Sequence, residues 1–189
     1  SWLQLPNPHQ RSNAEVLSPI WNGADVTKRS ADRWAVDFGA EMTEAEACLY
    51  EAPFGYIRDA VMPSRAGNRE ASRAARWWRY GRPRPELRRA GGQLDRWIVT
   101  SETAKHRVFV WLPRGIAPEH KLVVIPRADD VTMGLLSSRF HVLWAIRKGS
   151  TLEDRPVYTT SACFAPFPFP AGLTPADTAH QRTEALDSG

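Results

Sequence analysis

The chain has 189 residues, of which 42% are hydrophobic and 24% are charged. This length and balance predict one globular domain with a full core, and they exclude two independent catalytic domains. The longest apolar runs are far shorter than the roughly 20 residues of a membrane helix, so we expect a soluble protein.

The cysteines and the first residues indicate the cellular compartment and the extent of the chain. Cys48 and Cys163 are the two cysteines of the chain, and they form no Cys-x-x-Cys pair. Neither a disulfide framework nor a structural zinc site is therefore expected, and we expect a cytoplasmic location. The chain starts at Ser1 without an initiator Met or a signal peptide, so we interpret it as part of a longer protein.

The net charge of +4 is unevenly distributed along the chain. Residues 58–107 contain 13 Arg or Lys and 5 Asp or Glu, whereas the remainder contains 12 basic and 16 acidic residues. A basic belt on an otherwise acidic body is typical of a protein with an anionic partner, with nucleic acid as the first candidate and a membrane surface as the second. Because Arg-rich surfaces also arise from GC-rich genomes, composition alone leaves the partner open.

The first part of the chain shows no regular pattern before residue 33. Residues 1–31 are rich in Pro, Asn and Ser, which predicts an extended lead-in. The alternating run at residues 33–38 then predicts a strand, and Gly39 should end it.

A helix is predicted after this strand. Residues 43–46 form a capping box, and apolar residues recur at helical spacing as far as Val61. Pro53 should kink or divide this helix, and Pro63 should end it.

Residues 68–80 predict a second helix with one cationic face. Its arginines are spaced so that they lie near one side of a helix: Arg69, Arg73, Arg76 and Arg79. This stripe predicts contacts to DNA phosphates, and a plain solvated helical face is the competing interpretation. Trp77 and Trp78 cannot both face inward on one helix, so one of them should lie on DNA or on a neighbouring domain.

The second half of the chain predicts a sheet and a buried helix. Three short β-branched runs are typical of strands: residues 96–100, 107–112 and 121–125. Residues 135–148 lie between two glycines and predict a buried helix, in which His141 should be a core residue. A last strand is predicted at residues 155–164.

Proline limits the structure after that strand. Residues 164–170 alternate Phe with Pro, so they can form neither a central strand nor a helix, because proline lacks an amide donor. An extended segment is expected there. Thr174 and Asp177 are then typical of the cap of another helix.

One pair of residues raises the possibility of a nuclease. Glu119 and Lys121 have the spacing of a carboxylate and an amine beside a nuclease metal ion. The upstream Asp of such a site has no good candidate in the sequence. A solvated turn that enters the strand at residue 121 is the competing interpretation.

Several strings taken together resemble one family in their order and spacing. They are Asn7-Pro8, Trp21-Asn22-Gly23, Trp34 to Gly39, Glu51 to Phe54, Asn68-Arg69, Trp77-Trp78, Lys105 to Leu112, Leu136 to Trp144, Tyr158-Thr159 and Phe167 to Pro170. The chain is similar in these strings to the target recognition domain of the MmeI kind of DNA methyltransferase. The resemblance covers about residues 5–172.

The resemblance implies a division of labour between domains. In such enzymes a nuclease domain and a methyltransferase domain precede the recognition domain, which reads the base sequence of double-stranded DNA. This chain would then be the specificity module of an adenine-specific (N6) methyltransferase or restriction-modification enzyme, without catalytic residues of its own. S-adenosylmethionine, and Mg if a nuclease is attached, would belong to the parent enzyme, and neither cofactor should bind here.

The resemblance also implies which residues contact DNA. Base readout falls on residues after the late helix: Lys148, Glu153, Asp154, Arg155 and Thr159. In general Arg pairs with guanine O6 and N7, and a carboxylate accepts from cytosine N4. Independently of the resemblance, the basic residues themselves predict phosphate contacts at the four arginines of the stripe and at Lys105, His106 and Arg107. Arg139 lies in a stretch shared with the family, and it is either a further phosphate contact or a structural ion-pair partner.

These inferences together predict a mixed α/β (α+β) fold, with a small sheet and flanking helices of the DNA-methylase specificity-domain type. Residues 1–31 should lead in from an upstream methyltransferase domain, residues 32–170 should form the recognition domain, and residues 171–189 should form a tail that starts a helical segment. Two alternatives stay open at this stage. They are a docking module between domains without its own DNA affinity, and a small nuclease built on Glu119 and Lys121.

Overall fold

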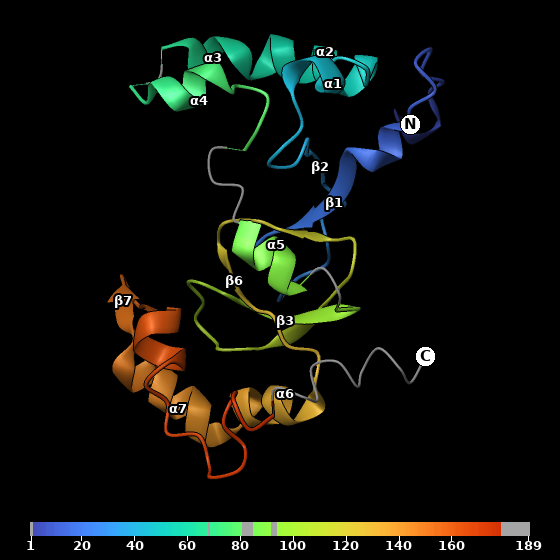
Figure 1. The fold of residues 1–189 in the computed structure, drawn as a ribbon. Coiled ribbons are helices and arrows are strands. Elements are labelled where there is room, and N and C mark those ends of the chain that lie inside the picture. Colours follow the sequence, from blue (N-terminus) through green and yellow to red (C-terminus); the bar gives the residue numbers. More distant parts are fainter. Residues whose placement is uncertain (1, 68, 81–84, 92–93, 179–189) are drawn as a thin grey trace. The chain divides into compact units, whose positions relative to one another are not determined.

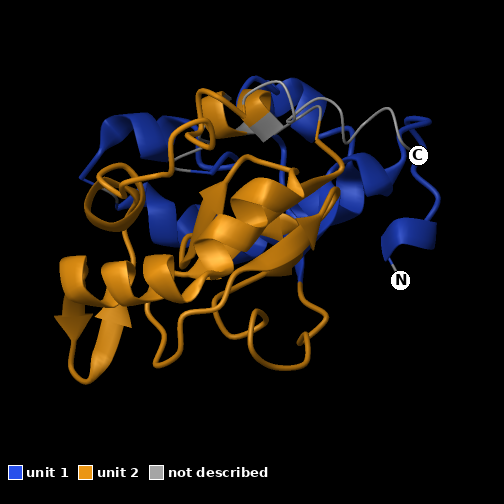
Figure 2. Ribbon diagram, turned by 90° about the horizontal axis from the view of Figure 1, so that it is seen from below, with its two compact units in different colours: residues 1–19, 34–85 blue, residues 20–33, 86–189 orange. Residues whose placement is uncertain are grey.

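The computed structural model describes residues 2–67, 69–80, 85–91 and 94–178. Its backbone contacts divide the chain into two compact units, which are coloured separately in Figure 2. Unit 1 contains residues 1–19 and 34–85, and unit 2 contains residues 20–33 and 86–189.

Unit 1 combines short helices with two antiparallel strands (Figure 1). Strand β1 (Leu17–Trp21) pairs with β2 (Trp34–Val36), and Leu17 lies opposite Val36. The helical elements in chain order are η1 (Trp2–Gln4), η2 (Asn13–Glu15), α1 (Glu44–Ala47), α2 (Glu51–Ala60), α3 (Met62–Ala66) and α4 (Ala71–Ala75).

The core of unit 1 is mostly aromatic. Its buried members are Val16, Phe38, Ala47, Tyr50, Phe54, Ile57 and Trp77. The predicted capping box at residues 43–46 is confirmed, since Thr43 Oγ1 accepts from Glu46 N at 3.2 Å and Glu46 Oε2 accepts from Thr43 N at 2.8 Å. These bonds satisfy amides that the first turn of α1 leaves free.

Two helix predictions for unit 1 are wrong. Three helices replace the helix that was expected to be kinked or divided at Pro53 and to end at Pro63. The breaks fall elsewhere, and Pro53 and Pro63 lie in the first turns of α2 and α3, where a missing amide costs nothing. The helix predicted over residues 68–80 shrinks to α4, and residue 68 lies outside the described residues. Trp77 is buried and Trp78 packs against the same core. Adjacent residues of a regular helix point about 100° apart, so the chain leaves the helix here and both rings reach one core.

Residues 1–31 are more ordered than an extended lead-in. They contain η1, η2 and part of the sheet pairing through β1. The buried Asn13 donates from Nδ2 to the Trp2 carbonyl at 3.1 Å, and Asn7 Nδ2 donates to the Leu49 carbonyl at 2.5 Å. Hydrogen bonds from side-chain amides thus hold this segment in place, although its sequence shows no strand or helix pattern. The domain boundaries after residues 31 and 170 stay a prediction.

Unit 2 is built on an antiparallel sheet of order β4-β3-β6. Its strands are β3 (Arg96–Ser101), β4 (Val110–Pro113) and β6 (Leu122–Ile125), and Ile98 lies between Trp111 and Ile125. The remaining elements are α5 (Pro85–Gly91), β5 (Ala117–Pro118), α6 (Asp130–Ser137), α7 (Arg139–Lys148), β7 (Ser150–Leu152), β8 (Arg155–Val157) and a π-helix, η3 (Thr160–Phe164). β5 pairs in parallel with the end of β1.

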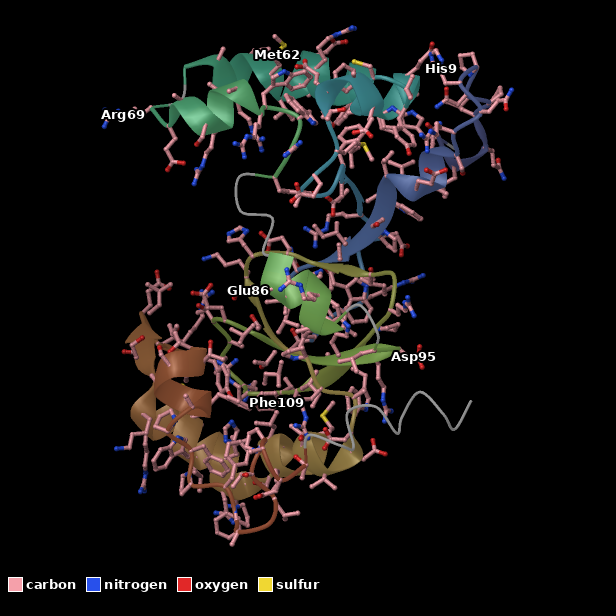
Figure 3. The ribbon with its side chains drawn as sticks, in the orientation of Figure 1. His9, Met62, Arg69, Glu86, Asp95 and Phe109 are labelled. Carbon is pink, nitrogen blue, oxygen red and sulfur yellow. The ribbon has the colours of Figure 1, made fainter. Side chains whose placement is uncertain are left out.

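Helices α6 and α7 cover one face of this sheet (Figure 1). The buried residues of this core are Ile98, Phe109, Ile125, Leu136, Ala145, Tyr158 and Cys163. Phe109 extends toward α7 from the segment before β4 (Figure 3) and lies 5.6 Å from the His141 ring. The prediction that His141 is a core residue is confirmed, because its side chain is fully buried.

Three predictions for unit 2 need correction. The helix over residues 135–148 is divided at Ser138, whose extended backbone lets its Oγ accept from His141 N at 3.2 Å and cap α7. The strand predicted at residues 155–164 ends at Val157, and Thr159 caps η3 in its place. The strand predicted at residues 107–112 starts at Val110, because Arg107 turns inward.

The architecture as a whole is the mixed α/β arrangement of small sheets and helices that the sequence predicts. Within the described ranges, no helix is both long and apolar enough to cross a membrane. Thr174 and Asp177 form the predicted capping contact, with a bond of 3.2 Å from Asp177 N to Thr174 Oγ1. Residues 174–178 form a turn, and the described residues contain no helix after η3. Residues 179–189 of the predicted tail lie outside the described residues.

Candidate nucleic-acid interface

Three of the predicted base-reading residues lie at the tip of one hairpin in unit 2. Leu152 of β7 pairs with Arg155 of β8, so Glu153 and Asp154 form a two-residue turn. All of these side chains are exposed. The Arg155 guanidinium lies 3.6 Å from Glu153 Oε2 and 3.7 Å from Asp154 Oδ1. These separations exceed hydrogen-bond length, so the charged groups are held close together while their donors and acceptors stay accessible.

The backbone at this tip is unusual for a residue with a side chain. Glu153 has φ of 57°, in the left-handed region that turns normally fill with Gly, Asn or Asp. A glycine would adopt this conformation without strain. The hairpin therefore keeps a carboxylate at its tip despite a conformational cost.

The other two predicted base readers lie at the base of the hairpin. Lys148 ends α7 and is exposed, with its Nζ 5.2 Å from the centre of the Trp144 ring. Thr159 is half-buried, and its Oγ1 accepts from Ala162 N at 3.3 Å as the cap of η3. The hairpin thus brings Glu153, Asp154 and Arg155 together, and it places Lys148 and Thr159 at the opposite end of the two strands.

The base of the hairpin packs tightly against α7 through Gly149. A Cβ atom at this position would lie 2.4 Å from the Val157 carbonyl oxygen and 2.8 Å from the Ala145 carbonyl oxygen. Gly149 N also donates to the Ala145 carbonyl at 2.9 Å and closes the helix. Only a residue without a side chain allows this close approach of strand and helix.

Arg107 connects the same hairpin to the end of β3. Its Nη2 donates to the Pro156 carbonyl at 3.1 Å and to the Glu102 carbonyl at 3.4 Å. Its Nη1 donates to Thr100 Oγ1 at 3.0 Å and to the Ser101 carbonyl. Both Nη groups of Arg107 are thus engaged within the protein, so Arg107 helps to hold the hairpin rather than presenting its charge to a partner.

A buried aromatic cluster lies beneath Arg107. The guanidinium lies 5.1 Å from the centre of the Tyr158 ring, and the Tyr158 hydroxyl is 3.0 Å from His141 Nε2. Burial, with a smaller contribution from the Arg107 charge, lowers the pKa of His141 to about 4. Burial likewise raises the pKa of Tyr158 far above its usual value. Both side chains are therefore neutral at physiological pH.

The remaining phosphate candidates of unit 2 are accessible. Lys105 and His106 are exposed in the loop between β3 and β4, and Arg139 is exposed at the start of α7. Within the described part of the chain, none of these three side chains lies in an ion pair. They therefore stay candidates for phosphate contacts.

The four arginines of the predicted stripe lie in unit 1 in different environments. Arg69, between α3 and α4 (Figure 3), and Arg76, at the end of α4, are exposed. Arg73 forms an ion pair of 2.6 Å with Glu70. Arg79 donates to the carbonyls of residues 40, 41 and 42 at 2.5, 3.0 and 2.9 Å. Arg79 therefore holds the fold of unit 1, and the predicted single stripe does not form.

The proposed nuclease pair is engaged in local contacts. Glu119 Oε2 accepts from Lys121 N at 3.1 Å, and Lys121 Nζ lies 3.8 Å from Glu102 Oε2. Among the residues that the structure describes, no group of three or more His, Cys, Asp or Glu could hold a metal ion. The geometry therefore does not favour the nuclease interpretation.

Two further exposed residues were missed by sequence reasoning. Leu152 is 59% exposed at the end of β7, and Arg147 is exposed beside Lys148 at the end of α7. The basic pair at the end of a predicted helix was a visible signal for Arg147. No sequence signal indicated Leu152, because its exposure follows from the hairpin itself.

A comparison with known families identifies the family of the chain. Residues 60–171, more than half of the chain, match the model of the target recognition domain of MmeI. The chain belongs to the MmeI target recognition domain family. All the predicted base-reading and phosphate-contacting residues lie within the matched range.

A solved structure shares the fold of this chain. The chain is similar to the Type IIL restriction-modification enzyme MmeI, solved in complex with DNA, with a TM-score of 0.61 and 17% sequence identity. This similarity covers 93% of the chain and 28% of that enzyme chain, and at this identity it establishes the fold alone. No curated protein matches the chain.

Proposed function

We propose that this chain is the sequence-specific, double-stranded DNA recognition module of a restriction-modification enzyme, and that the β7–β8 hairpin reads base edges. The observation that carries the proposal is the exposed Glu153, Asp154 and Arg155 at the tip of a hairpin whose base is fixed. The major groove of B-DNA admits a two-stranded β-ribbon. Membership of the family supports DNA as the partner.

The chemistry of the tip fits a C·G base pair. Arg155 provides two parallel donors for guanine O6 and N7, and Glu153 or Asp154 accepts from cytosine N4. When DNA binds, Arg155 and the two carboxylates would contact base edges in place of one another. Lys148 and Thr159, at the base of the hairpin, extend the readable site or contact the backbone.

The exposed cations supply affinity that does not depend on sequence. Arg69 and Arg76 in unit 1, and Lys105 and Arg139 in unit 2, neutralise phosphates and release counterions, and the exposed His106 adds a hydrogen bond to a phosphate. Arg147, next to Lys148, joins this set in our proposal. These contacts position the chain so that the hairpin reaches the bases.

Catalysis is assigned to other domains of the parent. We propose an adenine-specific (N6) methyltransferase domain in the same polypeptide that uses S-adenosylmethionine, with Mg where a nuclease is attached. The chain spans 28% of the solved enzyme that it resembles, which leaves room for such domains in a parent of that size. This chain holds none of these groups in our proposal, and the parent acts in the cytoplasm, where its DNA lies.

A selection experiment tests the proposal. The chain is used to select duplexes from a random library, and binding of the selected and scrambled duplexes is followed by fluorescence anisotropy. Arg155→Ala should lose roughly 5- to 150-fold in affinity on the selected duplex and little on the scrambled one, because a bidentate base contact contributes about 1–3 kcal/mol of discrimination. The matched control Arg147→Ala should weaken both duplexes equally.

A second variant removes the carboxylate without straining the hairpin. Glu153→Gly keeps the left-handed turn, so the melting temperature should not fall, while discrimination at one C·G pair should decrease. Equal losses on selected and scrambled duplexes for Arg155→Ala would remove the hairpin from base readout. Absence of any salt-dependent duplex binding would favour the docking alternative.

A further inference from the structure

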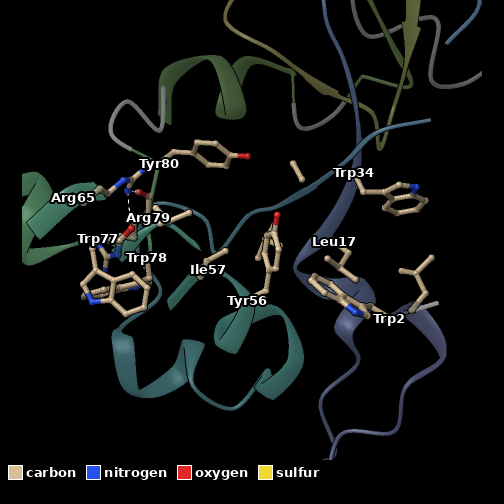
Figure 4. A pocket seen from close by; sticks show the side chains of 14 residues that line it. Trp2, Leu17, Trp34, Tyr56, Ile57, Arg65, Trp77, Trp78, Arg79 and Tyr80 are labelled. Carbon is tan, nitrogen blue, oxygen red and sulfur yellow. Dashed lines mark hydrogen bonds between the residues drawn. The ribbon is translucent and has the colours of Figure 1, made fainter. Parts of the chain in front are cut away.

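Unit 1 contains an aromatic groove that the hairpin does not involve. Its volume is about 580 Å³, which falls in the range of roughly 300–1,000 Å³ typical of small-ligand sites. Figure 4 shows aromatic side chains around the groove. They are Trp2, Trp34, Tyr56, Trp77, Trp78 and Tyr80.

Two of these rings are fixed in the protein. Trp77 is buried, and its Nε1 donates to Glu44 Oε1 at 3.2 Å. Trp78 Nε1 donates to the Met42 carbonyl at 3.0 Å, and its ring lies 6.1 Å from that of Trp77. These bonds hold one part of the groove wall in a defined geometry.

The other four rings are accessible. Trp34 is 52% exposed and Tyr56 is 55% exposed, while Tyr80 and Trp2 are 41% and 37% exposed. The rings of Trp2 and Tyr56 meet edge to face, 5.2 Å apart. Large aromatic surface is normally buried, so this concentration in one groove indicates a binding site.

The charge of the groove selects for an anion. Arg65 and Arg79 are the charged side chains in its lining, and no carboxylate lines it. Arg65 Nη1 donates to the Trp77 carbonyl at 2.7 Å, and the Arg79 guanidinium lies 5.5 Å from the centre of the Trp78 ring. Carbonyls accept their hydrogen bonds without cancelling their positive charge.

We infer that this groove binds an unpaired nucleotide of a DNA strand, with its base stacked on Trp34 or Tyr56 and its phosphate in the field of Arg65 and Arg79. Exposed aromatic faces within a cationic groove are the combination by which proteins hold single-stranded nucleic acid. A neutral apolar peptide would fill the groove but would bring no negative charge to the two cations, of which Arg79 also interacts with Glu46 outside the lining. A nucleotide uses the ring faces and the positive charge together.

The inference goes beyond duplex recognition by the hairpin. It concerns unit 1, and it requires a base that is not paired. Duplex readout depends on Arg155 in unit 2, so either site can fail without the other.

The test uses a labelled 12-nucleotide thymidine oligomer as the unpaired probe and a blunt, fully paired duplex as the second probe, each followed by anisotropy. Trp34→Ala and Tyr56→Ala should each weaken oligomer binding roughly 5- to 100-fold, the usual effect of losing one stacked base. Both should leave duplex affinity within about twofold. Tyr56→Phe keeps the ring face and should bind the oligomer like the unchanged chain.

The matched control is Phe140→Ala, which removes an 83% exposed aromatic side chain of α7 in unit 2. It should leave oligomer binding unchanged. Oligomer binding that falls equally in Phe140→Ala and Trp34→Ala, or an unchanged chain that does not bind the oligomer at all, would overturn the inference. In that case a protein segment would be the better candidate for the groove. Duplex binding would still test the proposed function separately.

Discussion

Arg107 Nη2 donates a hydrogen bond of 3.1 Å to the carbonyl oxygen of Pro156, in the second strand of the proposed reading hairpin. The same guanidinium reaches Thr100 and the carbonyls at the end of β3. An arginine expected to contact phosphate thus joins the central sheet to the hairpin. Arg107 therefore adds a side-chain connection to the backbone bonds that join the hairpin to the end of β3, from Tyr158 N to the Glu102 carbonyl at 2.7 Å and from Ala104 N to the Pro156 carbonyl at 3.3 Å.

Replacing Arg107 by Lys should therefore damage stability and specificity together. A lysine ammonium is a single point that cannot reproduce the fork of donors, so the variant should lose about 2–3 kcal/mol of unfolding free energy. Urea unfolding measures this loss. A loss of unfolding free energy below about 0.5 kcal/mol would contradict the positioning role. Arg107 would then again be a candidate for a phosphate contact.

Gly149→Ala should separate the hairpin from α7. The new Cβ would lie 2.4 Å from the Val157 carbonyl oxygen, so we expect an overpacking cost of about 1–3 kcal/mol in thermal or urea unfolding. Gly134→Ala is the matched control, because nothing lies within 4 Å of its Cβ position inside α6. The control should be neutral or gain about 0.5–1 kcal/mol. Similar losses in both variants would show that close packing at Gly149 is unimportant.

Charge reversal should distinguish two arginines of unit 1. Arg76→Glu changes an exposed side chain, so it should weaken all duplexes alike and reduce the slope of log affinity against log salt by about 1. Arg79→Glu instead places a carboxylate among three carbonyls, and it should lower the melting temperature before any binding effect can be measured. A stable Arg79→Glu chain with a reduced salt slope would restore Arg79 as a phosphate contact.

His141 should make stability depend on pH. Its pKa in the folded chain is lowered to about 4 by burial and by Arg107, whereas an unfolded His titrates near 6.5. Between these values the unfolded chain binds the extra proton, so stability is complete above about pH 6.5 and is lost as pH falls toward 4. The expected loss is about 3 kcal/mol.

Urea unfolding at several pH values between 4 and 7.5 measures this slope. His141→Gln should flatten the slope in this window, because it removes the titrating group while it can still pair with the Tyr158 hydroxyl. An unchanged slope in the variant would assign the pH dependence to other groups.

The sequence by itself determined the local features with short-range causes. The capping box at Thr43, the strands around Ile98 and Ile125, and the buried position of His141 follow from spacing and composition, and they are confirmed. The order of many short motifs also indicated the family, which the family match confirms. Each of these signals is contained in neighbouring residues or in their sequence order.

Only the tertiary structure decided which charged residues remain free. Arg76 and Arg79 look alike in the sequence, yet carbonyls some 37 to 39 residues away occupy Arg79. Arg107 likewise reaches Pro156, 49 positions along the chain. The gathering of Trp34, Tyr56 and Tyr80 around one groove has the same origin, because contacts between distant segments leave no local pattern in the sequence.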